Sequence, residues 1–523
     1  MKQNREIRFV DTTLRDGQLS LWASNMTTRM MLPIIDHIDA AGFEAFELIS
    51  SAFFKKAVRD LKEDLWERTR LVAQRAKKTP LRAIRSRSML AFQITPAAIA
   101  ELWLERLAAN GITELRTSDP SNTPSYWAEA VTGANRLGLK TILNIIYSIS
   151  PKHTDDYFLQ RIRAAAKLDV ARICFKDPGG LLTPERTRAL VPLILENAKG
   201  KPVEFHTHCT TGLGSPSCLE AIKAGIRSIN TAIPPLAEAS SNPSIFNVAM
   251  NARALGYSTA IDEQALQPVT DHFTAIAKQE NLPIGKPVEY DAFHPIHQVP
   301  GGMISNFRFQ LANLGKLDQL DAVLEEVVRV RAEFGYPIMV TPYSQFVGVQ
   351  AAINVIVGQR YKEVTDEMIQ YALGHWGEEE ARSIDANVRD MILSRPRAKE
   401  LAKWKLPEIS VKEFRAKFGG DGVSDDEKIL RYFAGEESVA IMKKAAPAKD
   451  HASAATPLVT LISSLAQRRD TRRIFIQRKD FSVRLEQRSA VGAAANAPPD
   501  TAERNRLSSS TAHSFLRWQS ESE

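Results

Sequence analysis

The sequence of 523 residues predicts an α/β fold, with a closed (β/α)8 TIM barrel followed by a mainly helical domain and a small C-terminal α+β unit. Short β-branched or apolar runs recur about every 30 residues, and each is followed by a segment with helical spacing. Eight such alternations fit within about 250 residues, the usual size of a closed parallel barrel. The expected strands are Ile7–Val10, Ala45–Leu48, Leu81–Arg85, Thr113–Thr117, Thr141–Ile146, Ala171–Phe175, Val203–His206 and Ser228–Ala232.

Glycines mark the ends of the expected helices. The segment MLPIIDHIDAAGF, between the first two strands, carries apolar residues at i, i+3, i+4 and i+7, and Gly42 follows as a helix stop. The same order of helix, glycine and strand returns at LAANGIT, NRLGLKT and LEAIKAGIRS. We therefore place the barrel at residues 1–255.

The pattern changes after the barrel. Longer amphipathic segments such as LDQLDAVLEEVVRVRAEFG predict a helical domain over residues 256–444. Residues 445–457 are rich in Ala, Pro and Ser, as in a linker. Residues 458–488 predict a short helix and a β-hairpin that turns near Arg478–Asp480, and residues 489–523 predict a disordered tail.

The composition is that of a soluble globular protein, with 44% hydrophobic and 25% charged residues. The chain has no apolar run of about 18 residues, the length that suggests a membrane helix. Its start, MKQNREIRFVDTTLRDG, enters the first strand without an apolar signal region. We therefore expect a cytoplasmic protein without a membrane span.

Charge and cysteine content exclude two further classes of protein. Of the net charge of +7, residues 445–523 contribute +4, so we expect no nucleic-acid binding by the main body. The three cysteines, Cys174, Cys209 and Cys218, form no CxxC pair. This argues against a disulfide framework and against a structural zinc ribbon.

The motif HTH predicts a metal site, because His206 and His208 point to the same side of a strand and can chelate one ion. Structural histidines are the alternative. Asp16, in DTTLRDG, follows the first strand and adds a carboxylate at the same rim. One Asp and two His suit Zn²⁺, Mn²⁺ or Co²⁺ better than Ca²⁺. Beside them, Arg15 could steady an anionic substrate or an enolate oxygen, or simply form a salt bridge.

Lys176 ends the sixth strand, in the apolar stretch ARICFKDPGGLLTP. Burial would lower its pKa, so that part of the amine is neutral. A neutral amine can take up CO₂ as a carbamate, whose oxygen would complete a metal shell. A structural lysine paired with a carboxylate is the alternative.

The sequence resembles the carboxyltransferase family shared by pyruvate carboxylase, the alpha subunit of oxaloacetate decarboxylase and the 5S subunit of transcarboxylase. DTTLRDG and HxH also occur in relatives of hydroxymethylglutaryl-CoA lyase, whereas Lys176 before Asp177 and QVPGGMISN at residues 298–306 are specific to the biotin-linked branch. The matching blocks, over about residues 6–375, are DTTLRDG, LKEDLWER, SPKHT, FKDPGGLLTP, HTHCTTG, NTAIPPLA, HQVPGGMISN and TPYSQFVGVQAAINVIVGQRYK.

The resemblance implies a helical domain that closes over the barrel rim, and a divalent metal in the site. It assigns the metal to four ligands, which are Asp16, His206, His208 and a carboxylated Lys176. In the family, carboxybiotin on a mobile carrier releases CO₂ in this site. The metal and arginines polarise the ketone of pyruvate toward its enol, which attacks the CO₂.

The resemblance also assigns roles to polar residues around the metal. Ser240 aligns with a threonine whose hydroxyl shuttles a proton between biotin and the methyl carbon. Arg85 matches a family arginine, and we expect Arg15 and Arg85 to be catalytic. We expect Gln18 and Arg85 to bind the substrate.

Three departures from the family pattern concern the substrate pocket. Leu19 replaces a glutamine that contacts pyruvate, unless a shift of one residue lets Gln18 take its place. Lys55 replaces a carboxylate, and Phe92 replaces the tyrosine seven residues after Arg85. Losing a buried hydrogen-bond partner costs about 1–3 kcal/mol. Either the acceptor differs from pyruvate, or biotin is held differently.

The chain has no biotin attachment motif of its own, because MKK at residues 442–444 ends a helical segment. We therefore expect the biotin carrier and the biotin carboxylase to be separate polypeptides, with residues 458–488 as a docking element. We also expect a homo-oligomer.

The predicted function is transfer of a carboxyl group between carboxybiotin and pyruvate or a related 2-oxo acid. Two alternatives stay open. One is a metal-dependent lyase or aldolase of the hydroxymethylglutaryl-CoA lyase type, and the other is a non-catalytic scaffold subunit.

Overall fold

The computed structural model falls into two compact units, residues 1–459 and residues 460–523, and each is described by itself. The residues that the structure describes are 5–89, 94–313, 315–406, 408–449, 451, 473–478 and 481–486.

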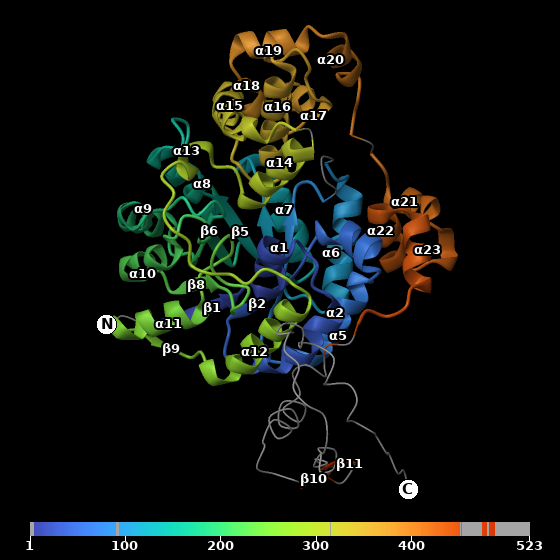
Figure 1. The fold of residues 1–523 in the computed structure, drawn as a ribbon. Coiled ribbons are helices and arrows are strands. Elements are labelled where there is room, and N and C mark those ends of the chain that lie inside the picture. Colours follow the sequence, from blue (N-terminus) through green and yellow to red (C-terminus); the bar gives the residue numbers. More distant parts are fainter. Residues whose placement is uncertain are drawn as a thin grey trace, which may run out of the picture. The chain divides into compact units, whose positions relative to one another are not determined.

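The first unit contains a closed parallel barrel (Figure 1). Its strands follow the chain from β2 to β8, then β1, and β1 also pairs with β2, so the sheet closes on itself. The predicted barrel is confirmed, with all eight strands at the expected positions. They are β1 (Glu6–Asp11), β2 (Ala45–Ser50), β3 (Leu81–Ser86), β4 (Glu114–Ser118), β5 (Lys140–Ile146), β6 (Arg172–Asp177), β7 (Val203–Thr207) and β8 (Ser228–Thr231).

Helices connect the strands and cover the outside of the barrel (Figure 1). The longer ones are α3 (Ile35–Ala40), α5 (Leu65–Arg75), α6 (Ala97–Ala109), α7 (Pro124–Arg136), α8 (Asp155–Ala166), α9 (Pro184–Asn197), α10 (Gly214–Ala224) and α11 (Ile245–Ala254). Shorter turns near the rim are η1 (Thr13–Gly17), α1 (Gln18–Trp22), α2 (Thr28–Met31), η2 (Leu32–Ile34), α4 (Phe53–Lys56) and η3 (Ala57–Leu61).

Local sequence signals explain where these helices start and stop. The hydroxyl of Thr154 accepts a hydrogen bond from the backbone NH of Tyr157 and caps α8, and Thr183 caps α9 in the same way. Gly42 follows α3 with φ of +87°, and a Cβ there would lie 2.7 Å from the carbonyl oxygen of Ala260. Only glycine fits both constraints without strain.

The chain beyond the barrel is helical, as predicted, apart from the two-residue strand β9 (Ser258–Thr259), which pairs with β1. Its helices are α12 (Glu263–Gln279), α13 (His294–His297), α14 (Gly301–Asn313), η4 (Leu317–Gln319), α15 (Leu320–Glu333), α16 (Tyr343–Val357), α17 (Asp366–Ala372), α18 (Glu378–Arg382), α19 (Ala386–Leu393), α20 (Pro396–Leu401), α21 (Val411–Lys417), η5 (Gly420–Gly422), α22 (Asp425–Ala434) and α23 (Glu436–Lys444).

These helices do not form one body, although the sequence suggested a single helical domain over residues 256–444. Helix α12 packs on α3 and joins the barrel core. Helices α14 to α17, α19 and α20 share a second core, and α21 to α23 return to the side of the barrel next to α6 (Figure 1). An amphipathic pattern shows that one face of a helix is buried, but it does not show which element buries it. Helix α22 packs against α4 and α6, and the ring of Phe433 stacks 4.9 Å from that of Phe54.

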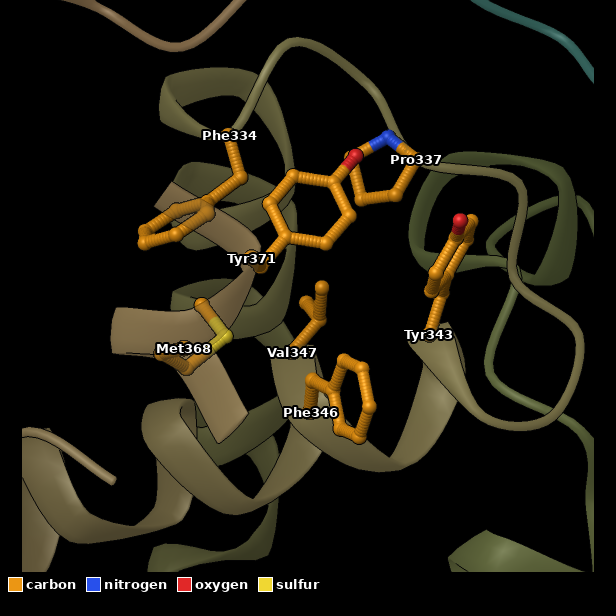
Figure 2. A pocket seen from close by; sticks show the side chains of 7 residues that line it. All are labelled: Phe334, Pro337, Tyr343, Phe346, Val347, Met368 and Tyr371. Carbon is orange, nitrogen blue, oxygen red and sulfur yellow. The ribbon is translucent and has the colours of Figure 1, made fainter. Parts of the chain in front are cut away.

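The second core is rich in aromatic side chains. Figure 2 shows the side chains that line a small pocket in this region, from the end of α15 and the loop after it, from α16 and from α17. They are Phe334, Pro337, Tyr343, Phe346, Val347, Met368 and Tyr371.

Three contacts hold this second core against the loops that follow β3, β4 and β5. The hydroxyl of Tyr343 bonds to Ser121, Arg331 donates to Ser148 at 2.9 Å, and Arg87 donates to the carbonyl of Trp376 at 2.8 Å. These loops leave the carboxyl ends of the strands, so the helices of the second core lie at the end of the barrel where such enzymes hold their sites.

In the second unit, β10 (Arg473–Arg478) and β11 (Phe481–Glu486) pair antiparallel, in the arrangement of the expected hairpin. The helix expected before them and the expected tail lie outside the described residues. Within the part of the chain that the structure describes, no helix is long and apolar enough to cross a membrane.

We predict that Phe433→Ala destabilises the barrel, because its ring fills the space between α22 and α4. Losing a buried phenylalanine costs about 3–5 kcal/mol in the free energy of unfolding, which urea titration measures. The control is Ile441→Ala on α23, where the side chain is 48% exposed, and we expect a change within about 0.5 kcal/mol. An unchanged unfolding free energy for Phe433→Ala would show that α22 does not pack on the barrel.

Candidate metal centre

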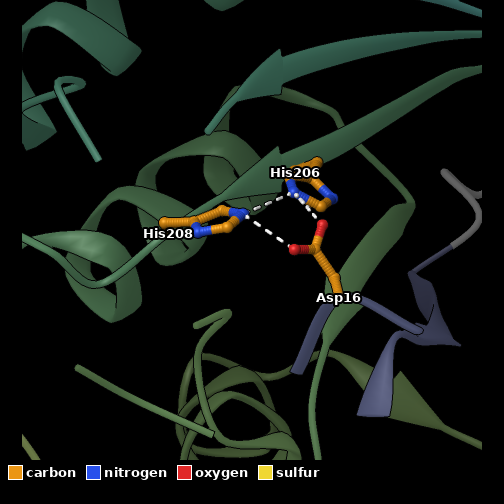
Figure 3. Close-up of side chains that lie close together, drawn as sticks. All are labelled: Asp16, His206 and His208. Atoms are coloured by element: carbon orange, nitrogen blue, oxygen red, sulfur yellow. Dashed lines mark hydrogen bonds and ion pairs between the residues drawn. The ribbon is translucent and has the colours of Figure 1, made fainter. Parts of the chain in front are cut away.

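Asp16, His206 and His208 lie together at the carboxyl ends of β1 and β7 (Figure 3). Asp16 sits in the π-helical turn η1, just after β1, and β8 separates β1 from β7 in the sheet. The carboxylate oxygens of Asp16 are 3.4 Å from Nε2 of His206 and 3.6 Å from Nε2 of His208. All three side chains are buried, so the structure brings together the three ligands expected from the sequence.

Lys176 joins this group from β6. It pairs in register with His206 on β7, and its Nζ is 3.6 Å from Oδ2 of Asp16. Burial lowers the pKa of the Lys176 amine and outweighs the opposing effect of the Asp16 carboxylate. The fourth expected ligand is therefore within reach of the other three.

Hydrogen bonds set the proton positions on both imidazoles. Nδ1 of His208 is 2.7 Å from the carbonyl oxygen of Ser240, which can only accept, so Nδ1 carries the proton and Nε2 has a free lone pair. Nδ1 of His206 is 2.9 Å from Oδ1 of Asn230, which leaves its Nε2 free in the same way. Burial holds the pKa of His206 well below its usual value, so this ring is neutral.

The donor set fits a divalent cation. The two Nε2 atoms are 3.1 Å apart, and both also face the carboxylate of Asp16. Arg15 and Lys176 contact the carboxylate of Asp16, and the two Nε2 atoms would face a cation bound among the three side chains. Two imidazoles and a carboxylate are ligands that suit Zn²⁺, Mn²⁺ or Co²⁺.

Arg15 lies next to the ligands and is itself paired. Its Nη2 is 2.8 Å from Oδ2 of Asp16, and its Nε donates to Oε2 of Glu47 at 2.6 Å. Burial alone would raise the pKa of Asp16, but Arg15, His208 and Lys176 hold it well below the usual range. The salt bridge considered as an alternative for Arg15 is thus present, beside the expected site.

Ser240 and Gln18 make other contacts than the expected ones. The hydroxyl of Ser240 donates to the carbonyl oxygen of Ser20 at 3.0 Å, while its own carbonyl orients His208. The amide of Gln18 donates to the carbonyl of Leu14 at 3.1 Å and accepts from the backbone NH of Met26. Gln18 therefore holds the local backbone, and this placement gives no support to a substrate contact.

Arg85 lies at the end of β3 and turns toward α7, where Tyr126 and Glu129 are its charged and polar neighbours. Burial lowers the pKa of its guanidinium. The structure thus gives no support to the expected contact between Arg85 and the substrate. Of the substituted pocket positions, Lys55 is exposed, Leu19 is 43% exposed, and Phe92 lies outside the described residues.

Sequence reasoning missed the groups that orient the ligands. Asn230 accepts from His206, and Asn242 donates to the carbonyl of Thr207 at 2.8 Å beside it. Arg116 and Glu47 are ion-paired under Arg15. The available signal was the occurrence of charged residues inside strands, as in ELRTS and VEFHT, where a barrel interior is normally apolar.

We predict that His206→Ala abolishes tight metal binding, because it removes a ligand from the centre of the set. Loss of a partner in the outer shell costs about 10–100-fold in affinity, and we expect a larger loss here. Titration of the metal-free chain with Zn²⁺ measures it. His272→Ala is the control, since this buried histidine on α12 donates to the carbonyl of Met30, away from the site. Equal affinities for the two variants would remove His206 from the ligand set.

Two family models match consecutive parts of the chain. The model described as HMGL-like matches residues 6–272, and the model described as a conserved carboxylase domain matches residues 295–467. The first covers the barrel, and the second covers the helices beyond it.

Relatives of known name are 32–36% identical to the chain over the aligned residues. A pyruvate carboxylase subunit of Methanocaldococcus jannaschii is 36% identical over 71% of this chain and 66% of its own length. The 2-oxoglutarate carboxylase large subunit of Hydrogenobacter thermophilus is 33% identical over 71% and 58%. The methylmalonyl-CoA carboxyltransferase 5S subunit of Propionibacterium freudenreichii is 32% identical over 72% and 75%. The chain thus spans about two thirds of the length of the first of these relatives.

A solved structure has the same fold. The carboxyl transferase domain of Rhizobium etli pyruvate carboxylase matches with a TM-score of 0.75 and 21% identity, over 92% of this chain and 83% of that one. The chain belongs to the carboxyltransferase family that includes the Methanocaldococcus jannaschii pyruvate carboxylase subunit and the transcarboxylase 5S subunit.

Proposed function

We propose that the protein is the carboxyltransferase subunit of a biotin-dependent enzyme. It moves a carboxyl group between carboxybiotin on a separate carrier protein and pyruvate or a related 2-oxo acid. The observation that carries this proposal is the convergence of Asp16, His206, His208 and Lys176 at the carboxyl end of the barrel. The named relatives support it, as do the Rhizobium etli structures, which contain pyruvate and biocytin.

The proposed cofactor is a divalent metal ion, Zn²⁺, Mn²⁺ or Co²⁺. Asp16, His206 and His208 would hold it, with a carbamate on Lys176 as the fourth ligand. When bound, the ion supplies a Lewis acid that polarises the ketone oxygen of the acceptor. The position of Lys176 beside His206, 3.6 Å from Asp16, supports the carbamate assignment.

Arg15 is the proposed partner of the enolate oxygen. Its guanidinium is buried beside Asp16, and Glu47 fixes its plane through Nε. A fixed positive group in a buried site stabilises developing negative charge more strongly than a solvated group does. Ion pairing with Asp16 and Glu47 thus supports this role as well as a structural one.

In the proposed reaction the N–C bond of carboxybiotin breaks, and a C–C bond forms between the released CO₂ and the methyl carbon of the acceptor. That carbon loses a proton, which the biotin nitrogen takes up. Ser240 is the proposed carrier of the proton. Its hydroxyl would have to leave the carbonyl of Ser20, to which it donates at 3.0 Å.

We propose that the carboxyl acceptor is a 2-oxo acid. One relative is named for pyruvate and another for 2-oxoglutarate, and the two are similarly related to this chain. Arg85 and Gln18 remain candidate substrate contacts from the resemblance alone, because the structure turns both toward other partners.

The proposed partners are a biotin carboxyl carrier protein and a biotin carboxylase. The relatives are named as subunits, which supports an enzyme made of several chains. Residues 458–488, which include β10 and β11, are the proposed docking element, and a homo-oligomer remains our expectation.

We predict that the protein, given carboxylated biotin carrier with a labelled carboxyl group, transfers the label to a 2-oxo acid. The assay compares pyruvate, 2-oxoglutarate and propionyl-CoA as acceptors. If no acceptor takes up label while the metal is bound, the transferase proposal is wrong. Cleavage of hydroxymethylglutaryl-CoA without biotin would instead support a lyase, the alternative that the HMGL-like match to residues 6–272 keeps open.

We also predict that Lys176→Ala weakens metal binding and abolishes transfer, because the fourth ligand is lost. Carbon NMR with ¹³C-bicarbonate should show a carbamate signal in the parent protein and none in the variant. Lys201→Ala is the control, since Lys201 donates to the carbonyl of Val170 at 3.2 Å, away from the site. Full transfer by Lys176→Ala would exclude the carbamate from the mechanism.

A further inference from the structure

We propose that Arg116, buried inside the barrel beneath the metal centre, is a positioning residue for His206. Arg116 fixes the orientation of the Asn230 amide, and that amide selects the tautomer of His206 that leaves Nε2 free for a metal ion. The inference rests on the proposed metal centre. It goes beyond it in naming the residue that prepares one ligand for binding.

Arg116 occupies the interior of the barrel. It lies on β4, is fully buried, and contacts side chains from β2, β7 and β8, which it can reach only across the inside of the sheet. Its Nη1 is 2.6 Å from Oε1 of Glu47, and its Nη2 is 2.6 Å from Oε2 of Glu204. The same Nη2 donates to Oδ1 of Asn230 at 2.7 Å.

The direction of these hydrogen bonds fixes the tautomer. A guanidinium can only donate, so the atom of Asn230 that faces Arg116 must be the amide oxygen. That oxygen is also 2.9 Å from Nδ1 of His206, and because an amide oxygen can only accept, Nδ1 must carry the proton. A neutral imidazole has one proton, so Nε2 keeps its lone pair.

The contact of the Asn230 amide nitrogen agrees with this orientation. Its nitrogen faces Oε2 of Glu204 at 3.4 Å, which is a donor facing an acceptor. If the amide were reversed, two donors would face each other at Arg116 and two acceptors would face each other at Glu204. Arg116 and Glu204 together therefore allow one orientation of Asn230.

Asn242 gives independent support for a free Nε2 on His206. Its amide nitrogen donates to the carbonyl of Thr207 at 2.8 Å, which identifies that atom as the donor. The same nitrogen is 3.3 Å from Nε2 of His206, so Nε2 faces a donor and is the acceptor. Nη1 of Arg116 is also 3.5 Å from Nδ1 of His206, but its closer partner is Oε1 of Glu47 at 2.6 Å, and the Asn230 oxygen is the nearer neighbour of Nδ1.

Arg116 also supports Arg15 through Glu47. The carboxylate of Glu47 binds Arg116 with one oxygen and Arg15 with the other. One buried guanidinium thus orients both a proposed ligand and the proposed partner of the enolate oxygen. This arrangement is the kind of outer shell that orients metal ligands in other proteins.

Arg82 offers a matched control one layer deeper. It is also fully buried inside the barrel and also binds Glu204, at 2.8 Å, but its second carboxylate is Glu114, at 2.7 Å. Among the described residues, the hydrogen bonds and ion pairs of Arg82 include neither Asn230 nor His206. Replacing Arg82 therefore removes a comparable charge and a partner of Glu204, while the proposed relay, the hydrogen bonds among Arg116, Asn230 and His206, stays in place.

The test measures Zn²⁺ affinity of the metal-free full chain by competition with a chromophoric chelator, together with melting temperature. We expect Arg116→Met to bind Zn²⁺ about 10–100-fold more weakly, as for loss of an outer-shell partner. We expect Arg82→Met to lower the melting temperature while its affinity stays within about twofold of the parent, since the relay is intact.

Two further variants keep the test decisive if Arg116→Met does not fold. Asn230→Leu removes the acceptor for Nδ1 and should weaken binding as much as Arg116→Met, while Asn230→Asp keeps an acceptor and should restore affinity. ¹⁵N NMR of the metal-free chain should report a proton on Nδ1 of His206 in the parent, and on Nε2 in part of the Asn230→Leu molecules.

The outcomes separate this inference from the metal centre itself. If the parent chain binds no Zn²⁺, the proposed metal centre fails. If the parent binds but Asn230→Leu and every folded Arg116 variant bind equally well, the positioning role is overturned. An equal loss of affinity in Arg82→Met would also overturn it, because the effect would then come from barrel packing.

Discussion

The pairing of charges inside the barrel is the constraint on which the rest of the site depends. Arg82 and Arg116 are fully buried, and each binds two carboxylates, with Glu204 shared between them. An unpaired buried charge costs several kcal/mol, so such side chains are tolerated only as a connected set. Burial raises the pKa of Glu204, but Arg82 and Arg116 outweigh it and hold the pKa below its usual value, which keeps Glu204 charged in the folded protein.

The proposed metal centre adjoins this network of buried ion pairs at the carboxyl end of the barrel. Asp16 lies beside Arg15, which Glu47 links to Arg116 below. The two histidines turn Nε2 toward Asp16, because Asn230 and Ser240 accept hydrogen bonds from their Nδ1 atoms. With Lys176 as an ammonium group, the carboxylates of this network are matched by Arg15, Arg82, Arg116 and Lys176. The proposed carbamate would replace the positive charge of Lys176 by a negative one, and the proposed divalent cation would offset that change.

Local patterns in the sequence were enough to predict the barrel and the proximity of Asp16, His206 and His208. The helix stop at Gly42 and the strand at Val203–His206 follow from short-range backbone preferences, and strand order then follows from the βα repeat. Because parallel strands end at one rim, Asp16 and His206 could be brought together without knowledge of the structure.

The remaining features depend on which residues meet in space, and this cannot be deduced from local sequence patterns. Alternation along β3 already turns Arg85 away from the interior that Arg82 enters, but its partner Tyr126, on α7, cannot be deduced from the sequence. An amphipathic pattern also does not identify the element against which a helix packs. The contact of Phe433 on α22 with the barrel helix α4 could therefore not be predicted. Asn230 in NTAIPP gave no signal because its role arises from contacts made across the barrel.

The central claim is that a divalent ion sits among two imidazoles and oxygen ligands at this rim. X-ray absorption at the metal edge of the zinc-loaded full chain tests it directly. The account predicts two histidine nitrogens and two or more oxygens at about 2.0–2.2 Å, with no sulfur. A sulfur ligand at about 2.3 Å, or a shell without imidazole, would contradict it.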